Sequence, residues 1–203
     1  MAGLRERKKL ATRAAIHDGA MRLFAQHGFA GTTIDQIAAA ANVSRATVFS
    51  YFPAKEDIVF GDAPQAVDAL AAALSDSDGG TVAVVRAWLR ELTGWIEPEL
   101  LLQRRLAREV PGVGARRLRI GRDVERVVAG ALERELGPGG RLTARLAAAA
   151  LVAALDLAEE EAAARMEEGG EPPGGDELDR ILDSAAAFAE AGMAALGARA
   201  TDG

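Results

Sequence analysis

Apolar residues recur every three or four positions along most of this chain, which is the spacing of one face of an α-helix. Near the N-terminus Ile16, Ala20 and Phe24 follow this spacing, and Gly28 supplies a stop signal for the helix that contains them. β-Branched and aromatic residues are too sparse and too irregularly placed to predict alternating strands. The pattern therefore predicts an all-α protein.

About nine helices are predicted by this spacing and by the glycine, proline and serine clusters between the apolar runs. The predicted ranges are 5–28, 33–41, 45–51, 54–74, 81–96, 98–109, 113–136, 141–168 and 176–197. The first three helices form a predicted N-terminal bundle, in which Thr32 or Thr33 caps the second helix and Ser44 caps the third. Asn42 and Val43 provide the tight turn between these two short helices.

The last two predicted helices carry more apolar surface than one monomer core can bury. Helix 141–168 has one apolar stripe made of Leu142, Leu146, Ala149, Ala153 and Leu157. A second stripe on the same helix is made of Leu151, Leu155, Ala158 and Ala162. Helix 176–197 contributes Leu178, Ile181, Leu182, Ala185, Phe188, Ala189 and Leu196. We therefore expect a homodimer, joined by a four-helix interface of helices 141–168 and 176–197.

Charge is divided unevenly along the chain. The whole sequence has a formal net charge of −6, which by itself argues against nucleic-acid binding. Residues 1–55, however, hold eight basic and three acidic side chains, so this part carries +5 and the remainder carries −11. A basic N-terminal part attached to an acidic body is typical of a domain that binds a polyanion.

Several function classes lack the residues that they need. The chain has no cysteine, which excludes disulfides, thiolate metal sites and thiol nucleophiles. His17 and His27 have no partner ligands at helical spacing, so we expect no metal. No nucleophile with a base and no phosphate-binding loop is present, so we expect neither an enzyme nor a cofactor. Without a membrane span or a signal-peptide pattern, the expected location is the cytoplasm.

One segment carries a specific motif. Residues 32–57 read TTIDQIAAAANVSRATVFSYFPAKED, and this stretch resembles the DNA-binding signature of the TetR/AcrR family of transcriptional regulators. The shared positions are Phe24, Gly28, Thr33, Ile37, Ala38, Ala41, Val43, Ser44, Thr47, Tyr51, Phe52, Lys55 and Glu56. The resemblance covers about residues 10–60. It implies a helix-turn-helix DNA-binding domain over 1–53 and a ligand-binding and dimerisation domain over 54–203, connected by helix 54–74.

The third predicted helix would enter the major groove of DNA. Its outward side chains, which we expect to contact bases, are Arg45, Ala46, Phe49 and Ser50. A second set has the hydroxyl and ammonium groups that suit phosphates, namely Thr33, Ser44, Thr47, Tyr51 and Lys55. Many family members have tyrosine where Phe49 stands, so one expected hydroxyl contact is missing. The basic arm from Arg5 to Arg13 is expected to extend along the DNA backbone or minor groove. For residues 33–55, the alternative to a DNA-binding motif is a helical hairpin with ordinary caps.

A ligand site is predicted in the C-terminal part. Trp88 and Trp95 lie seven residues apart, on one face of a helix, where they could line a pocket or simply pack in the core. Seven arginines and a single acid occupy residues 104–122, and they are Arg104, Arg105, Arg108, Arg116, Arg117, Arg119 and Arg122. The stretch RRLAREVPGVGARRL resembles regulators that respond to acyl-CoA-like ligands, which implies phosphates held by Arg104 and Arg108. The alternative to a ligand site is that the arginines of residues 104–122 are exposed and pair with acids at the surface.

These patterns together predict a homodimeric repressor that a small-molecule effector releases from a palindromic operator in double-stranded DNA. The effector candidates are an acyl-CoA-like compound or another apolar anion, and the predicted link between effector and DNA is helix 54–74. The alternative is a helical ligand-binding or adaptor protein of the same fold that does not recognise an operator.

Overall fold

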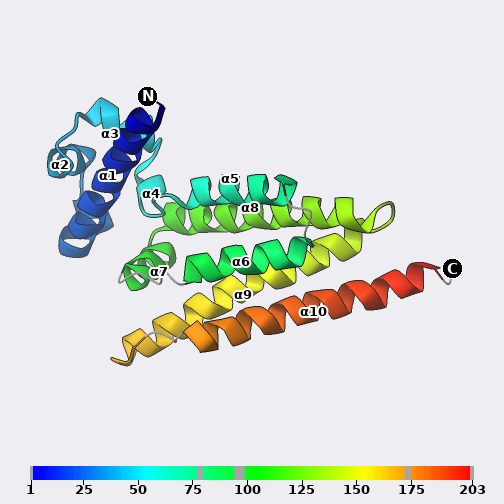
Figure 1. Cartoon of the computed structure of the whole chain (residues 1–203). Coiled ribbons are helices and arrows are strands. Elements are labelled where there is room, and N and C mark those ends of the chain that lie inside the picture. Colours follow the sequence, from blue (N-terminus) through cyan, green and yellow to red (C-terminus); the bar gives the residue numbers. More distant parts are fainter. Residues whose placement is uncertain (1, 77–79, 94–98, 172–174, 202–203) are drawn as a thin grey trace. The chain divides into compact units, whose positions relative to one another are not determined.

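The computed structural model describes residues 2–76, 80–93, 99–171 and 175–201, and all regular structure in these ranges is helical. The helices are α1 (Ala2–Gly31), α2 (Ile34–Ala40), α3 (Arg45–Tyr51), α4 (Lys55–Ile58), α5 (Ala63–Asp76), α6 (Thr81–Thr93), α7 (Leu100–Glu109), α8 (Pro111–Leu136), α9 (Arg141–Glu167) and α10 (Gly175–Thr201) (Figure 1). The prediction of an all-α protein is confirmed.

The described residues form two compact units. The first contains residues 1–63 together with 102–118, and the second contains residues 64–101 together with 119–203. These units do not coincide with the predicted division between residues 53 and 54, because part of α7 and the start of α8 pack with the N-terminal helices. As a division of function, that boundary stays a prediction.

The core of the first unit joins residues that are far apart in the chain. Ile16, Phe24 and Phe52 are almost completely buried, as the helical spacing predicts. Leu106 of α7 and Val113 of α8 belong to the same apolar cluster. Residues 102–118 therefore supply part of the hydrophobic core beneath the N-terminal helices.

The predicted helix 54–74 is wrong as a single element, because the chain turns between α4 and α5. Gly61 lies in this turn with a φ of 46°, in the left-handed region that favours glycine. A Cβ atom at this position would lie 3.1 Å from the ring of His17. The apolar spacing continues through Ile58, Val67 and Leu70, so periodicity did not reveal the break.

The second unit is a helical bundle in which α9 packs against α10 and α6 (Figure 1). The buried positions of α9 are mostly alanines, whose small side chains allow neighbouring helices to approach closely. The stripe that contains Leu151 and Ala158 is directed into this core. The stripe of Leu142, Leu146 and Leu157 is exposed. The prediction that this helix has two apolar faces, of which the monomer buries one, is thus confirmed.

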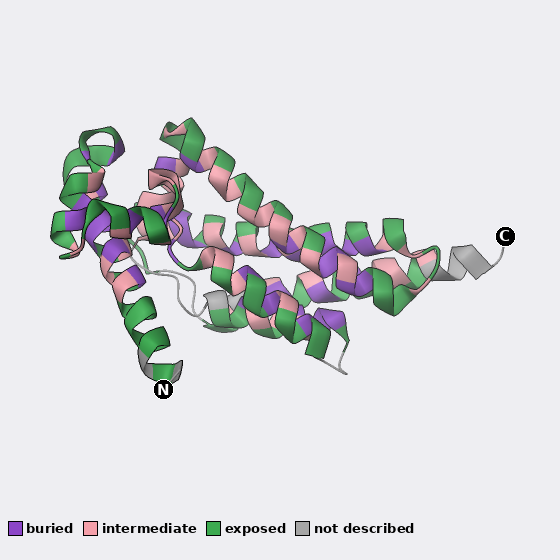
Figure 2. Cartoon of the chain, turned by 90° about the horizontal axis from the view of Figure 1, so that it is seen from above, coloured by how far each residue is buried: buried purple, intermediate pink, exposed green. Residues whose placement is uncertain are grey.

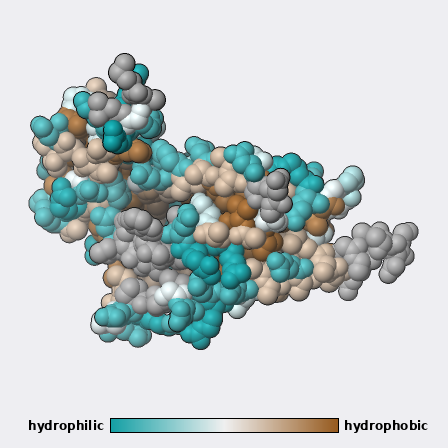
Figure 3. Space-filling view, in the orientation of Figure 1, coloured by the Kyte–Doolittle hydropathy of each residue, from teal (hydrophilic) through white to brown (hydrophobic). Residues whose placement is uncertain are grey.

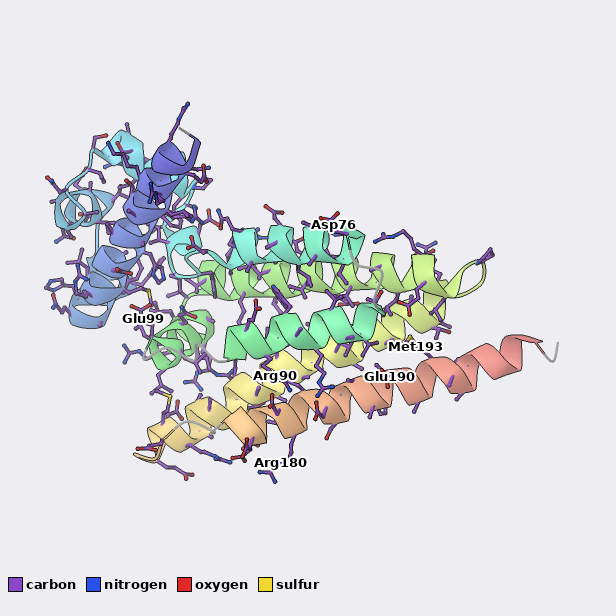
Figure 4. All side chains as sticks on the ribbon, in the orientation of Figure 1. Asp76, Arg90, Glu99, Arg180, Glu190 and Met193 are labelled. Carbon is purple, nitrogen blue, oxygen red and sulfur yellow. The ribbon has the colours of Figure 1, made fainter. Side chains whose placement is uncertain are left out.

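Charged side chains connect α6 and α10. Arg90 forms an ion pair with Asp179, and Arg86 forms one with Asp183, each with a nitrogen–oxygen distance of 2.6 Å. Figure 4 labels Arg90 on α6. The hydrogen bond from Arg90 to Asp179 also raises the pKa of the Arg90 guanidinium. Hydrophilic side chains gather over this part of the bundle in Figure 3. Exposed pairs of this kind add little stability, so burial of apolar residues is the main support of the bundle.

Candidate nucleic-acid interface

Two short capped helices, α2 and α3, form a helix-turn-helix. Thr33 caps α2 because its hydroxyl accepts a hydrogen bond from the backbone of Gln36, whose side chain in turn accepts one from the backbone of Thr33. Asn42 adopts a φ of 54° in the turn, and Ser44 caps α3 by accepting a hydrogen bond from the backbone of Thr47. The predicted caps at Thr33 and Ser44 are confirmed, and they fix the start of each helix.

The outer face of α3 carries the residues that we expect to contact bases. Val48 is directed into the core, whereas Arg45, Ala46, Phe49 and Ser50 are all exposed. Phe49 keeps 40% of its surface exposed, so it is one of the large apolar side chains at the surface. These side chains share one solvent-facing surface, and their contact with DNA stays a prediction.

The side chains predicted to bind phosphates surround this face. Thr33 and Ser44 are exposed, and Thr47 and Tyr51 are half-buried. The hydroxyls of Ser44 and Thr47 lie 2.8 Å apart in one hydrogen bond. Because these hydroxyls already bond to each other or to the helix N-terminus, a phosphate would have to share them with their partners inside the protein.

The N-terminal arm is helical and continuous with the rest of α1. Its first turns are exposed, as Figure 2 shows for the helix that begins at the N-terminus. The basic side chains Arg5, Lys8 and Lys9 line a hollow of about 970 Å³ together with Ser50 and Tyr51 from the end of α3. A polar, basic hollow beside the outer face of α3 suits a phosphate of a DNA backbone.

Arg13 does not belong to this arm, contrary to prediction, because it is buried with 8% of its surface exposed. Its guanidinium donates to the backbone carbonyls of Tyr51 and Gly61 and to the carboxylate of Asp62. It also lies 4.1 Å from the centre of the Phe52 ring. The sequence contained a signal for this role, since residue 13 shares the helical face of the buried Ile16.

Comparison with known proteins agrees with this geometry. The family described as "Bacterial regulatory proteins, tetR family" matches residues 16–60. The chain carries the DNA-binding domain of the TetR family.

The curated relatives that match this chain include transcriptional regulators, and each of the two described next matches less than half of this chain. The HTH-type transcriptional repressor AcnR of Corynebacterium efficiens is 33% identical over 49% of this chain and 53% of its own length. The HTH-type transcriptional regulator RutR of Escherichia coli K12 is 34% identical over 43% of this chain and 42% of its own length. The chain thus spans about half the length, or less, of the curated relatives that it matches.

Solved structures extend the likeness to the whole fold. FadR of Thermus thermophilus, a TetR-family transcriptional repressor solved in complex with lauroyl-CoA, is 24% identical to this chain. The match covers 89% of this chain and 94% of that one, with a TM-score of 0.54. The fold of both units is therefore the TetR-family fold.

Lys55 has an internal role in the TetR-family domain that differs from the predicted phosphate contact. Its ammonium donates to the carbonyls of Phe29 and Thr32, at 2.7 and 2.9 Å, and lies 4.2 Å from the centre of the Phe29 ring. Burial lowers the pKa of Lys55, and the nearby carboxylate of Glu56 opposes this effect. These two carbonyls lie just after Gly28, whose backbone is not helical, and the carbonyl of Phe29 also accepts a hydrogen bond from the backbone of Thr32.

Residues of α8 stabilise α4 inside the same domain. One carboxylate oxygen of Asp57 accepts a hydrogen bond from the backbone of Ala54, which caps the N-terminus of α4. The other oxygen lies 2.6 Å from Nε of Arg116. Arg116 belongs to the arginine cluster predicted to attract an anionic ligand, and instead pairs with an acid of the TetR-family domain.

The predicted ligand residues are divided between the two units. Arg104 and Arg108 lie one turn apart on α7 in the first unit, where Arg104 is half-buried and Arg108 is exposed. Trp88 belongs to the second unit and packs partly buried against its apolar core. Trp95 lies outside the described residues. Their joint role in binding a ligand stays a prediction.

The part of the chain described by the structure contains no helix that is long and apolar enough to span a membrane. Within the same residues, no group of three or more histidine and acidic side chains is arranged to hold a metal ion.

Proposed function

We propose that this chain is a homodimeric transcriptional regulator that represses genes by binding a palindromic operator in double-stranded DNA. The observation that carries the proposal is the outer face of α3, where Arg45, Phe49 and Ser50 are exposed at the end of a capped helix-turn-helix. The family match over residues 16–60 supports the same function.

Within the operator, two sets of side chains do different work. Arg45 donates to the N7 and O6 of a guanine, and Ala46 and Phe49 contact thymine methyl groups. Thr33, Ser44, Thr47 and Tyr51, with the basic arm, bind phosphates and fix the position of α3 in the groove. Lys55 acts indirectly, because it holds the end of α1 against the start of α2.

The dimer is formed by α9 and α10. Apart from Phe49, the largest exposed apolar side chains include Leu142, Leu146 and Leu157 on α9 and Phe188 on α10, and Phe188 has 72% of its surface exposed. A groove of about 620 Å³, lined by Leu157 and Phe188 among others, runs along this surface. A two-fold dimer places two α3 helices in successive major grooves, about 34 to 36 Å apart.

A small molecule releases the operator in this scheme, and an acyl-CoA-like compound is our candidate. Arg104 and Arg108 of α7 would bind its phosphates. The lauroyl-CoA found in the structurally similar FadR supports this candidate. A ligand that favours a different placement of α4 changes the spacing of the α3 helices, with a coupling of typically about 1 to 3 kcal/mol.

The test begins by selecting DNA sequences with the purified full-length chain and titrating an enriched site at several salt concentrations. We expect a short inverted repeat, bound with a steep salt dependence. A double variant, Arg45→Ala with Tyr51→Ala, should lose this binding, whereas Arg22→Ala removes an exposed charge from α1 and should keep most of it. If neither the free protein nor the protein with lauroyl-CoA enriches a palindrome, the adaptor alternative is favoured.

The effector is tested by adding lauroyl-CoA to the operator complex. Release is expected for the wild-type protein and should be lost in an Arg104→Glu and Arg108→Glu variant. An Arg119→Glu and Arg122→Glu variant carries the same change in net charge and should still respond. Equal response of both variants would overturn the assignment of the α7 arginines.

A regulator that binds the chromosome acts in the cytoplasm, which is the location we propose.

A further inference from the structure

Arg45, at the start of α3, is held from two sides. Its Nη1 lies 3.0 Å from the Oδ2 of Asp35 and donates a hydrogen bond to it across the helix-turn-helix. Its Cζ lies 5.5 Å from the centre of the Phe49 ring, one turn further along α3. The side chains of Arg45 and Asp35 are both exposed, so this arrangement stands at the surface that we expect to face DNA.

We propose that Asp35 is a specificity-determining residue, which holds the Arg45 guanidinium in the orientation that contacts one base of the operator. The inference rests on the proposed function, because it concerns the same surface of α3. Phe49 completes the arrangement: its ring supports the guanidinium plane from α3, and the carboxylate of Asp35 fixes its direction from α2.

The physical reason lies in the cost of an acid near DNA. A carboxylate on this surface repels phosphates, so Asp35 lowers the affinity for DNA of any sequence. An exposed ion pair contributes little to folding stability, so stability of the fold does not explain why an acid stands at position 35. Orientation does give a reason, because Asp35 occupies one Nη1 donor and leaves the remaining guanidinium donors for the N7 and O6 of guanine.

Without the carboxylate, Arg45 has an alternative partner. A long, flexible arginine side chain that is no longer tied to Asp35 can rotate and bind a phosphate, which is present beside every base. Binding then persists, but it depends less on sequence. The expected signature of Asp35→Asn is therefore a loss of base preference together with an unchanged or higher affinity for random DNA.

The experiment uses the full-length protein and an operator selected by the wild-type chain. The position contacted by Arg45 is found as the one where Arg45→Ala loses its preference, and all four bases are then compared there. For Asp35→Asn we expect the preference at this position to fall about tenfold, while preferences elsewhere in the half-site persist. The salt dependence should become steeper by about one phosphate contact.

Two further variants separate orientation from charge. Asp18→Asn removes the same charge from α1, where Asp18 lies beside His17, and should leave the base preference unchanged. Phe49→Leu keeps an apolar side chain but removes the ring, and should lower the preference at the Arg45 position by a smaller factor than Asp35→Asn.

The outcomes distinguish this inference from the proposed function. If the wild-type chain binds an operator and Asp35→Asn retains the full preference at the Arg45 position, the inference about Asp35 is wrong and the proposed function stands. If Asp18→Asn produces the same loss, net charge explains the effect and orientation does not. If the wild-type chain selects no operator, both proposals fail.

Discussion

The guanidinium of Arg13 donates to the backbone carbonyl of Tyr51 over a distance of 2.8 Å. This bond joins the middle of α1 to the last residue of α3, although the two residues are 38 positions apart in the sequence. The same guanidinium binds the carbonyl of Gly61, in the turn that precedes α5. Arg13 thus connects the predicted DNA-contacting helix with the turn in which the chain leaves α4.

Replacement of Arg13 should therefore destabilise the first unit and weaken DNA binding together. Arg13→Met keeps much of the length of the side chain but removes the donor to the carbonyls of Tyr51 and Gly61 and to the carboxylate of Asp62. We expect a loss of about 2 to 4 kcal/mol in the free energy of unfolding, measured by urea denaturation. Arg22→Met, at an exposed position of the same helix, is the control and should change stability by less than about 0.5 kcal/mol. Equal effects of the two variants would contradict the role of Arg13.

Gly61 should not tolerate a side chain. Its φ of 46° is unfavourable for alanine, and the added Cβ would meet the ring of His17 at 3.1 Å. We expect Gly61→Ala to lower the free energy of unfolding by about 1 to 3 kcal/mol, as seen in thermal melting. Adding His17→Ala should restore part of this loss by removing the close contact. No restoration would indicate that backbone strain alone is responsible.

Lys55→Met separates the internal role of this lysine from a direct phosphate contact. The variant removes the donor to the carbonyls of Phe29 and Thr32, so stability should fall by about 1 to 2 kcal/mol. If the ammonium only supports the fold, the dependence of operator affinity on salt should keep its slope. A slope reduced by about 0.9, with stability unchanged, would instead identify Lys55 as a phosphate ligand.

The dimer prediction depends on the exposed stripe of α9 and α10. Leu146→Glu and Phe188→Glu place charges on this stripe and should each raise the fraction of monomer, measured by light scattering after size-exclusion chromatography. Leu118→Glu changes a leucine on α8 that is also exposed, and should leave the oligomeric state unchanged. A dimer that persists in both stripe variants would exclude α9 and α10 as the interface.

Much of this molecule could be predicted from local sequence. The caps at Thr33 and Ser44, the turn at Asn42 and the outward face of α3 depend on neighbouring residues, and all were predicted correctly. The buried stripe of α9 also follows from helical spacing alone, since Ala158 lies one heptad after Leu151.

The features that the sequence did not reveal depend on contacts between distant residues. Gly61 breaks the predicted connecting helix because α1 closes on it through Arg13 and His17. Lys55 binds the carbonyls of Phe29 and Thr32, which lie 26 and 23 positions away in the sequence. The pair of Arg45 and Asp35 forms across two helices, so neither residue alone predicts it. Helical periodicity describes one helix at a time and carries no information on such pairs.

The placement of residues 102–118 also bears on how such proteins can exchange parts. Because Leu106 and Val113 complete the core beneath the N-terminal helices, the chain enters the first unit twice. Genetic exchange that replaced only the first 63 residues would pack the N-terminal helices of one protein against Leu106 and Val113 of another. We therefore expect such an exchange to need compensating changes in α7 and the start of α8.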